Sequence, residues 1–131
     1  MTACGLWLGR RGLAAVLADG GGRIRLAITI PATHAARLAL VELLATVNAD
    51  LVVEEPLLPA DPIAFVARCA GVRVWVAGPP LVASLRIAAG IDRRPPRASA
   101  ALLARLPATP WLRAHLRRVE PADDPRQVQL L

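Results

Sequence analysis

The stretch that decides the fold is LVVEEPLL, residues 51–58. An apolar run leads into two adjacent carboxylates, Glu54 and Glu55, and Pro56 then interrupts strand pairing because proline has no N–H to donate. The pattern predicts a buried strand that delivers both glutamates to the carboxyl edge of a sheet, where α/β proteins commonly place their functional groups. The alternative is that the two glutamates simply end a strand in solvent.

Three apolar segments precede this strand and predict an antiparallel meander. The first two are separated by the short turn RRG, and the second and third by Asp19 and three glycines, which form a hairpin signal. A helix should follow, with Thr33 as its N-cap. The strands are expected at residues 3–9, 13–18 and 23–30, and the helix at residues 34–47. The expected buried face of the helix comprises Leu38, Val41, Leu44 and Ala45.

Helices and strands alternate after residue 33, which predicts parallel strands joined by right-handed crossovers. Asp61 before Pro62 marks a helix start, and Gly71 marks the end of that helix. Another strand is expected at residues 72–77, and further helices at residues 81–89, 98–106 and 111–119. The sequence thus predicts an α/β fold with a mixed five-stranded sheet flanked by helices. We expect residues 1–118 to form a single domain and residues 119–131 to form a C-terminal tail.

Composition limits the possible classes of protein. The chain has 131 residues, of which 55% are hydrophobic, but no apolar run approaches the roughly 18 residues of a membrane helix. The N-terminal segment does not show the basic, apolar and small-residue order of a signal peptide, so we expect a cytoplasmic protein without a membrane partner. Cys4 and Cys69 have no neighbouring ligands at metal-binding spacing and are expected to be reduced core thiols.

The charge balance favours a polyanionic partner such as DNA or RNA. All 16 basic residues are Arg, and with 10 acidic residues the formal net charge is +6. The absence of Lys indicates a coding bias towards Arg, which accounts for part of this signal, but guanidinium groups are well suited to phosphate contacts. The candidate nucleic-acid-binding residues are Arg93, Arg94, Arg97, Arg113, Arg117 and Arg118.

Three features in this order resemble the ribonuclease H-like fold. They are GLWLG at residues 5–9 with the hairpin segment after it, VVEEPLL after a helix, and the spacing from residue 71 to the LPATP segment at residues 106–110. Within that fold the chain resembles the RuvC-like Holliday-junction resolvases and the related DEDD-type transposases of bacterial insertion sequences. The resemblance covers roughly residues 3–110.

The resemblance implies a site for two divalent metals, built by carboxylates of the first strand, the fourth strand and a C-terminal helix. In this chain Trp7 stands where the family carries the first-strand Asp, and an indole offers a metal no lone pair. Glu54 matches the fourth-strand acid, and Glu55 follows it. The expected C-terminal helix contains no carboxylate. The remaining acids near that region are Asp92, Glu120, Asp123 and Asp124.

We therefore expect a catalytically degenerate domain that uses no cofactor and binds nucleic acid or a protein partner of a DNA-processing system. An alternative is an active endonuclease that holds Mg²⁺ or Mn²⁺ at Glu54, with Glu55 and with acids from the tail or another subunit. A third hypothesis is a structural or assembly subunit, for example a homodimer, that uses exposed Trp residues and the apolar VQLL segment of the tail.

Overall fold

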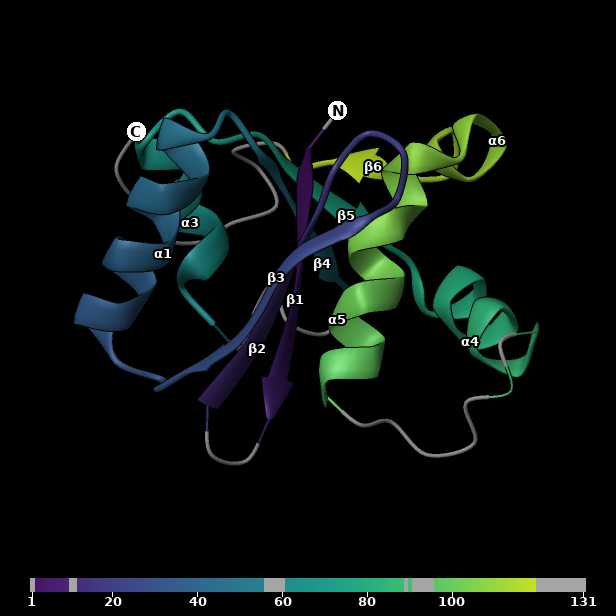
Figure 1. Ribbon diagram of the computed structural model, residues 1–131, viewed down its shortest axis with the longest axis horizontal. Coiled ribbons are helices and arrows are strands. Elements are labelled where there is room, and N and C mark those ends of the chain that lie inside the picture. Colours follow the sequence, from purple (N-terminus) through teal and green to yellow (C-terminus); the bar gives the residue numbers. More distant parts are fainter. Residues whose placement is uncertain (1, 10–11, 56–60, 89, 91–95, 120–131) are drawn as a thin grey trace.

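A single mixed sheet with helices on both faces organises the molecule (Figure 1). The structure, a computed structural model, describes residues 2–9, 12–55, 61–88, 90 and 96–119. The strand order is β3-β2-β1-β4-β5-β6. Helices α1 and α3 cover one face, and α4 and α5 cover the other (Figure 1). In the described part of the chain, no helix is long and apolar enough to cross a membrane.

The predicted meander is confirmed. Strands β1 (Ala3–Gly9), β2 (Gly12–Ala18) and β3 (Ile24–Ile30) are antiparallel neighbours. Asp19 closes the turn between β2 and β3, because its Oδ1 accepts hydrogen bonds from the backbone N–H groups of Gly21 and Arg23, both at 3.0 Å. Residues 10 and 11 of the expected first turn lie outside the described residues.

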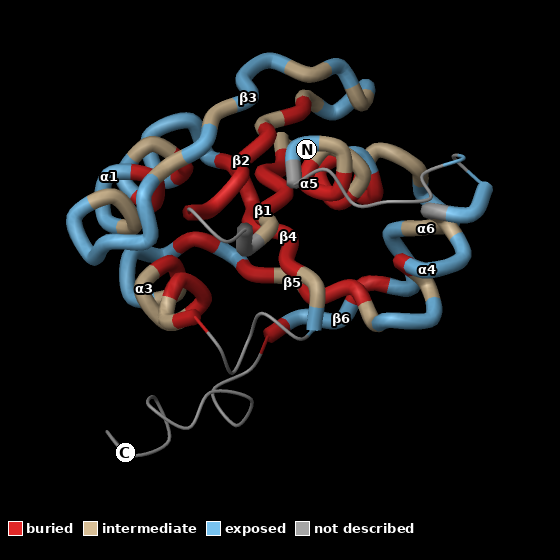
Figure 2. Tube along the Cα trace, turned by 90° about the horizontal axis from the view of Figure 1, so that it is seen from below, coloured by how far each residue is buried: buried red, intermediate tan, exposed pale blue. Residues whose placement is uncertain are grey.

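The predicted parallel strands are also confirmed. Strand β4 (Asp50–Glu54) lies parallel to both β1 and β5 (Val74–Ala77). Its apolar residues 51–53 are fully buried, and Figure 2 shows β1, β2, β4 and β5 as a buried centre between the helical layers. Strand β4 therefore holds the two halves of the sheet together, as its sequence predicts.

Helix α1 (His34–Thr46) begins where the sequence predicts but buries a different stripe. Thr33 Oγ1 accepts the N–H of Ala36 at 3.2 Å, so the predicted N-cap is confirmed. The buried residues are Leu40, Val41 and Leu44. The predicted Leu38 is 41% exposed, and Ala45 is exposed too. Two overlapping apolar stripes share residues 41 and 44, and only packing against the sheet selects between them.

Helix α3 (Ile63–Cys69) starts one residue after the predicted position, with Pro62 as its N-cap residue. Asp61 still satisfies the first turn, because its Oδ1 accepts the N–H of Ile63 at 2.9 Å. The same carboxylate accepts hydrogen bonds from Nε and Nη2 of Arg37 at 2.8 and 2.7 Å. This bidentate pair ties α1 to the start of α3, and the hydrogen bonds that Arg37 donates to Asp61 raise the pKa of the Arg37 guanidinium. Gly71, just after α3, has a φ of 82°, as expected for a left-handed helix end.

The C-terminal region differs from the prediction. Helix α4 (Pro79–Ala88) and helix α5 (Pro96–Arg105) are followed by the 3₁₀ turn η1 (Leu106–Ala108) and by α6 (Pro110–Arg113). Instead of one helix over residues 111–119, the chain forms β6 (Arg117–Arg118), antiparallel to β5. The N–H of Val119 donates to the carbonyl of Val74 at 2.9 Å, and Val119 is buried. The sheet thus has six strands and not five, because β5 would otherwise be an unpaired edge.

Helix α5 crosses β1 in close backbone contact at Gly5. A Cβ atom on Gly5 would lie 1.9 Å from the carbonyl oxygen of Ala100 and 2.5 Å from the backbone nitrogen of Ala104. Both atoms belong to the helix backbone and cannot move aside as a side chain can. Gly5 is therefore required for α5 to pack here.

We expect Gly5→Ala to lower the free energy of unfolding by about 3 kcal/mol or more, because the added methyl group forces α5 away from β1. Urea denaturation followed by circular dichroism measures this change. Gly21→Ala is the matched control, since the nearest atom to its added Cβ is 3.5 Å away, in ordinary contact. An equal loss of stability in both variants would contradict the packing argument.

Candidate functional site

The carboxyl end of β4 brings Glu54 next to Trp7. In the parallel register Gly5 pairs with Val52 and Leu6 with Val53, so one residue further Trp7 lies beside Glu54. Side chains alternate along a strand, and both residues therefore belong to the face that α5 covers. The position next to Glu54 on the neighbouring strand is thus occupied by an indole.

Trp7 is half-buried and packs against the small apolar residues of β2 and α5. Trp75 packs in a different apolar cluster, so the two indoles do not share one. An indole has an N–H group that can donate a hydrogen bond but no lone pair that can bind a metal ion.

Glu55 lies just beyond β4 and differs from Glu54 in its surroundings. Its backbone N–H donates to the carbonyl of Ala77 at 3.1 Å, and the residue is exposed. Its Oε2 would be 3.9 Å from a Cβ atom added to Gly78, so this carboxylate lies over the start of the β5–α4 connection. The two predicted glutamates are thus at the predicted edge of the sheet, with Glu54 partly covered and Glu55 in solvent.

The residues that the structure describes do not by themselves form a two-metal site. Within the described ranges, no three His, Cys, Asp or Glu side chains gather closely enough to hold a metal ion. The residue beside Glu54 on β1 is Trp7, and the short helix α6 carries no acid. The other acids considered from the sequence, Asp92, Glu120, Asp123 and Asp124, lie outside the described residues.

The predicted basic residues are divided between the two ends of the sheet. Arg97 is in the first turn of α5, at the end where β1 finishes, whereas α6 and β6 lie at the end where β1 starts (Figure 1). The expected helix over residues 111–119 would place Arg113 and Arg117 one turn apart on one face. That expectation is wrong, because α6 ends at Arg113 and Arg117 is in β6. The described members Arg97, Arg113, Arg117 and Arg118 are all exposed. Arg93 and Arg94 lie outside the described residues.

A polar cluster at the opposite end of β4 was not predicted. Asp50 is only 2% exposed, and its carboxylate accepts Nε of Arg73 at 3.1 Å and Nε1 of Trp75 at 2.9 Å. The guanidinium of Arg118 lies over the Trp75 ring, 5.4 Å from its centroid. The parallel register sets Leu51 beside Val74, so Asp50 adjoins Arg73. An acid at the start of one strand and an Arg at the start of its neighbour were the signal available in the sequence.

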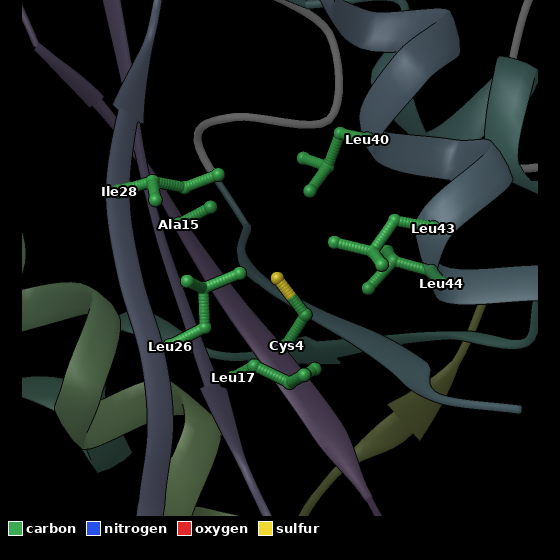
Figure 3. A pocket seen from close by; sticks show the side chains of 8 residues that line it. All are labelled: Cys4, Ala15, Leu17, Leu26, Ile28, Leu40, Leu43 and Leu44. Carbon is green, nitrogen blue, oxygen red and sulfur yellow. The ribbon is translucent and has the colours of Figure 1, made fainter. Parts of the chain in front are cut away.

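An apolar cavity between the meander and α1 is too small to be a ligand site. Its lining side chains come from β1, β2, β3 and α1 and converge around the sulfur of Cys4 (Figure 3). Its volume is about 10 Å³, close to the minimum that holds a single water molecule. Burial raises the pKa of the Cys4 thiol from 9.0 to about 12. We conclude that Cys4 is a packed core residue.

The expectation of two core thiols is wrong for Cys69. This residue is the last of α3 and is exposed. Helix α3 buries Ile63, Ala64 and Ala67, and Cys69 falls outside that stripe. The chain therefore contains one buried and one accessible thiol.

Comparison with known proteins places this architecture in the ribonuclease H-like class of α/β folds. The chain has the RuvC-like form of that fold. It is similar to T. thermophilus RuvC in complex with a Holliday junction substrate, with a TM-score of 0.62 and 18% sequence identity over 91% of this chain and 99% of that chain. A second Thermus thermophilus RuvC structure has 20% identity and a TM-score of 0.49, and covers 91% of this chain and 100% of its own. No family model and no curated protein matches the sequence.

We expect one thiol of the native protein to react rapidly with Ellman's reagent at pH 8, and the other to react only after unfolding. Cys4 keeps its proton up to a pH of about 12, whereas an unfolded thiol ionises near 9.0. The unfolded state therefore binds fewer protons between these values, and Cys4 makes folding less favourable as the pH rises above 9.0. Cys69→Ser should remove the rapid phase, and two equally rapid thiols in the native protein would contradict the assignment.

Proposed function

We propose that this chain is a RuvC-like domain that binds nucleic acid and has lost two-metal nuclease chemistry. The observation that carries the loss of chemistry is the indole of Trp7 beside Glu54, on the strand and face where a second carboxylate is needed. Two-metal cleavage requires several carboxylates around a pair of ions about 4 Å apart. Glu54 and Glu55 are then the remaining acids of a site whose other members have been replaced.

The surface that we propose for binding consists of Trp111, Arg113, Arg117 and Arg118, called here the α6–β6 surface. The three arginines are exposed, and Trp111 is 68% exposed. Guanidinium groups bind phosphate oxygens in a bidentate manner, and an exposed indole offers a stacking platform for an unpaired base. The formal net charge of +6 and the likeness to a RuvC described with a Holliday junction substrate support nucleic acid as the partner.

We expect the protein to bind branched or single-stranded nucleic acid with little sequence preference. Fluorescence anisotropy should show that affinity falls by about two to three orders of magnitude between roughly 20 and 200 mM salt, as expected for contacts with three or four phosphates. Arg113→Gln should reduce the slope of log affinity against log salt by about 1. Arg97→Gln removes the same charge from the opposite end of the sheet and should reduce affinity less. An equal loss in the two variants would reject the α6–β6 surface, and no binding at low salt would reject the function.

We expect Trp7→Asp to create a Mn²⁺ site, because it places a second carboxylate beside Glu54. Calorimetric titration should show that Trp7→Asp binds Mn²⁺ at least about tenfold more tightly than Trp7→Asn does. Trp7→Asn is the matched control, because it removes the same indole without adding charge. Glu54→Gln in the Trp7→Asp background should abolish the gain. The nuclease alternative would instead be established if the native protein cleaves nucleic acid in the presence of Mg²⁺ or Mn²⁺ and Glu54→Gln abolishes this cleavage. The other metal ligands would then come from elsewhere in the chain or from another subunit.

A role in assembly is the second candidate function. Its support is the exposure of large apolar side chains, with Ile87 on α4 81% exposed and Trp111 68% exposed. Such residues commonly anchor protein interfaces. Light scattering across a concentration series distinguishes the self-associating form of this candidate, because a homodimer doubles the mass whereas a nucleic-acid-binding monomer does not.

A further inference from the structure

An open pocket of about 190 Å³ lies at the β6 edge of the sheet. Three arginines line it, and each comes from a different segment. Arg68 is in the last turn of α3, Arg73 precedes β5, and Arg118 is in β6. Among the described residues, the lining of this pocket contains no acidic side chain. The fold therefore brings together three positive charges from distant parts of the sequence, since Arg68 and Arg118 are 50 residues apart.

Two of these arginines are held in place by one buried carboxylate. Asp50 accepts Nε of Arg73 through Oδ1, and through Oδ2 it accepts the indole N–H of Trp75. Trp75 in turn lies under the guanidinium of Arg118. Asp50 thus fixes Arg73 directly and Arg118 through the ring, before any ligand arrives. Such preorganisation lowers the entropy that binding must overcome.

The geometry of Arg73 leaves donors for a ligand. Arg73 donates to Asp50 through Nε. Within the described part of the chain, no hydrogen bond involves its two terminal amino groups, Nη1 and Nη2. Half of the Arg73 side chain is exposed, whereas Asp50 is buried. The described lining of the pocket carries three guanidinium groups and no acidic side chain. The chemistry fits an oxyanion that accepts several charge-assisted hydrogen bonds at once.

We propose that this pocket binds a phosphate group of a nucleic acid strand. The inference rests on the proposed function for the source of the phosphate, because Arg118 belongs both to the pocket and to the α6–β6 surface. Val119, which follows Arg118, lines the pocket and is fixed to β5 by its backbone hydrogen bond to Val74. A strand that crosses the α6–β6 surface therefore delivers one phosphate to three arginines.

The first measurement uses inorganic phosphate as the probe. In ¹H–¹⁵N spectra of the full chain, phosphate should shift the Nε–H signals of Arg73 and Arg118 and the indole N–H of Trp75. Arg68→Gln and Arg118→Gln should each weaken phosphate binding at least about tenfold, since each removes a charged donor. Both substitutions leave the hydrogen bonds of Asp50 intact, and the spectra of the variants report whether they fold. Arg73→Lys keeps the charge but loses the fixed fork of donors, and it should weaken binding too.

The second measurement uses a single-stranded oligonucleotide with and without a 5′-phosphate. Arg68→Gln should lower oligonucleotide affinity more than Arg97→Gln does, although each removes one positive charge. If the native protein binds the oligonucleotide but Arg68→Gln and Arg97→Gln lose equal affinity, the pocket inference is overturned and the proposed function stands. If inorganic phosphate binds at the pocket but no oligonucleotide binds, the nucleic-acid source and the proposed function are both overturned. A tighter complex with the 5′-phosphorylated strand identifies a terminal phosphate as the ligand, and equal affinities identify a backbone phosphate.

Discussion

The rest of the structure depends on the contact between the backbone of β1 and the backbone of α5 at Gly5. No side chain separates the two elements there, so α5 lies flat against the sheet and its Ala100 and Ala104 reach the small residues of β2. A face built from alanine, glycine and valine allows this short distance. Because α5 is fixed in this way, the face that carries Trp7 and Glu54 has a defined cover, and the segment after α5 is directed back to the free edge of β5.

Strand β4 places a carboxylate at each of its ends, and the two have different surroundings. Glu54 finishes the strand at the carboxyl edge of the sheet, where α/β proteins commonly place functional groups, but its neighbour on β1 is Trp7. Asp50 starts the strand and is buried, with Arg73 and Trp75 as its partners. Desolvating such an ion pair is costly, so its contribution to stability is small or negative. Its clearer effect is orientation, since it fixes the position of Arg73 and of the ring beneath Arg118.

The pair of Arg37 and Asp61 serves a comparable purpose on the other face. It is bidentate, mostly shielded from solvent, and joins the first turn of α1 to Asp61, two residues before α3. Asp61 also caps the first turn of α3 through Ile63, so one side chain positions two helices. Taken together, Asp50 and Asp61 account for the buried acids in the described residues, and both act on arginines. The acids at the carboxyl edge remain partly or fully in solvent.

The sequence by itself determined the meander, the parallel alternation, the Thr33 cap and the absence of a carboxylate at residue 7. These features depend on local turn chemistry, hydrophobic period and residue identity, which neighbouring residues settle. Only the tertiary structure decided which stripe of α1 is buried, that residues 117 and 118 form a strand, and that the arginines separate to two ends of the sheet. It also decided that Asp50, Arg73, Trp75 and Arg118 meet. The physical reason is that each of these outcomes depends on contacts between elements distant in sequence. Packing against the sheet selects the buried stripe of α1, and pairing with the open edge of β5 outweighs the helical preference of the short segment that forms β6.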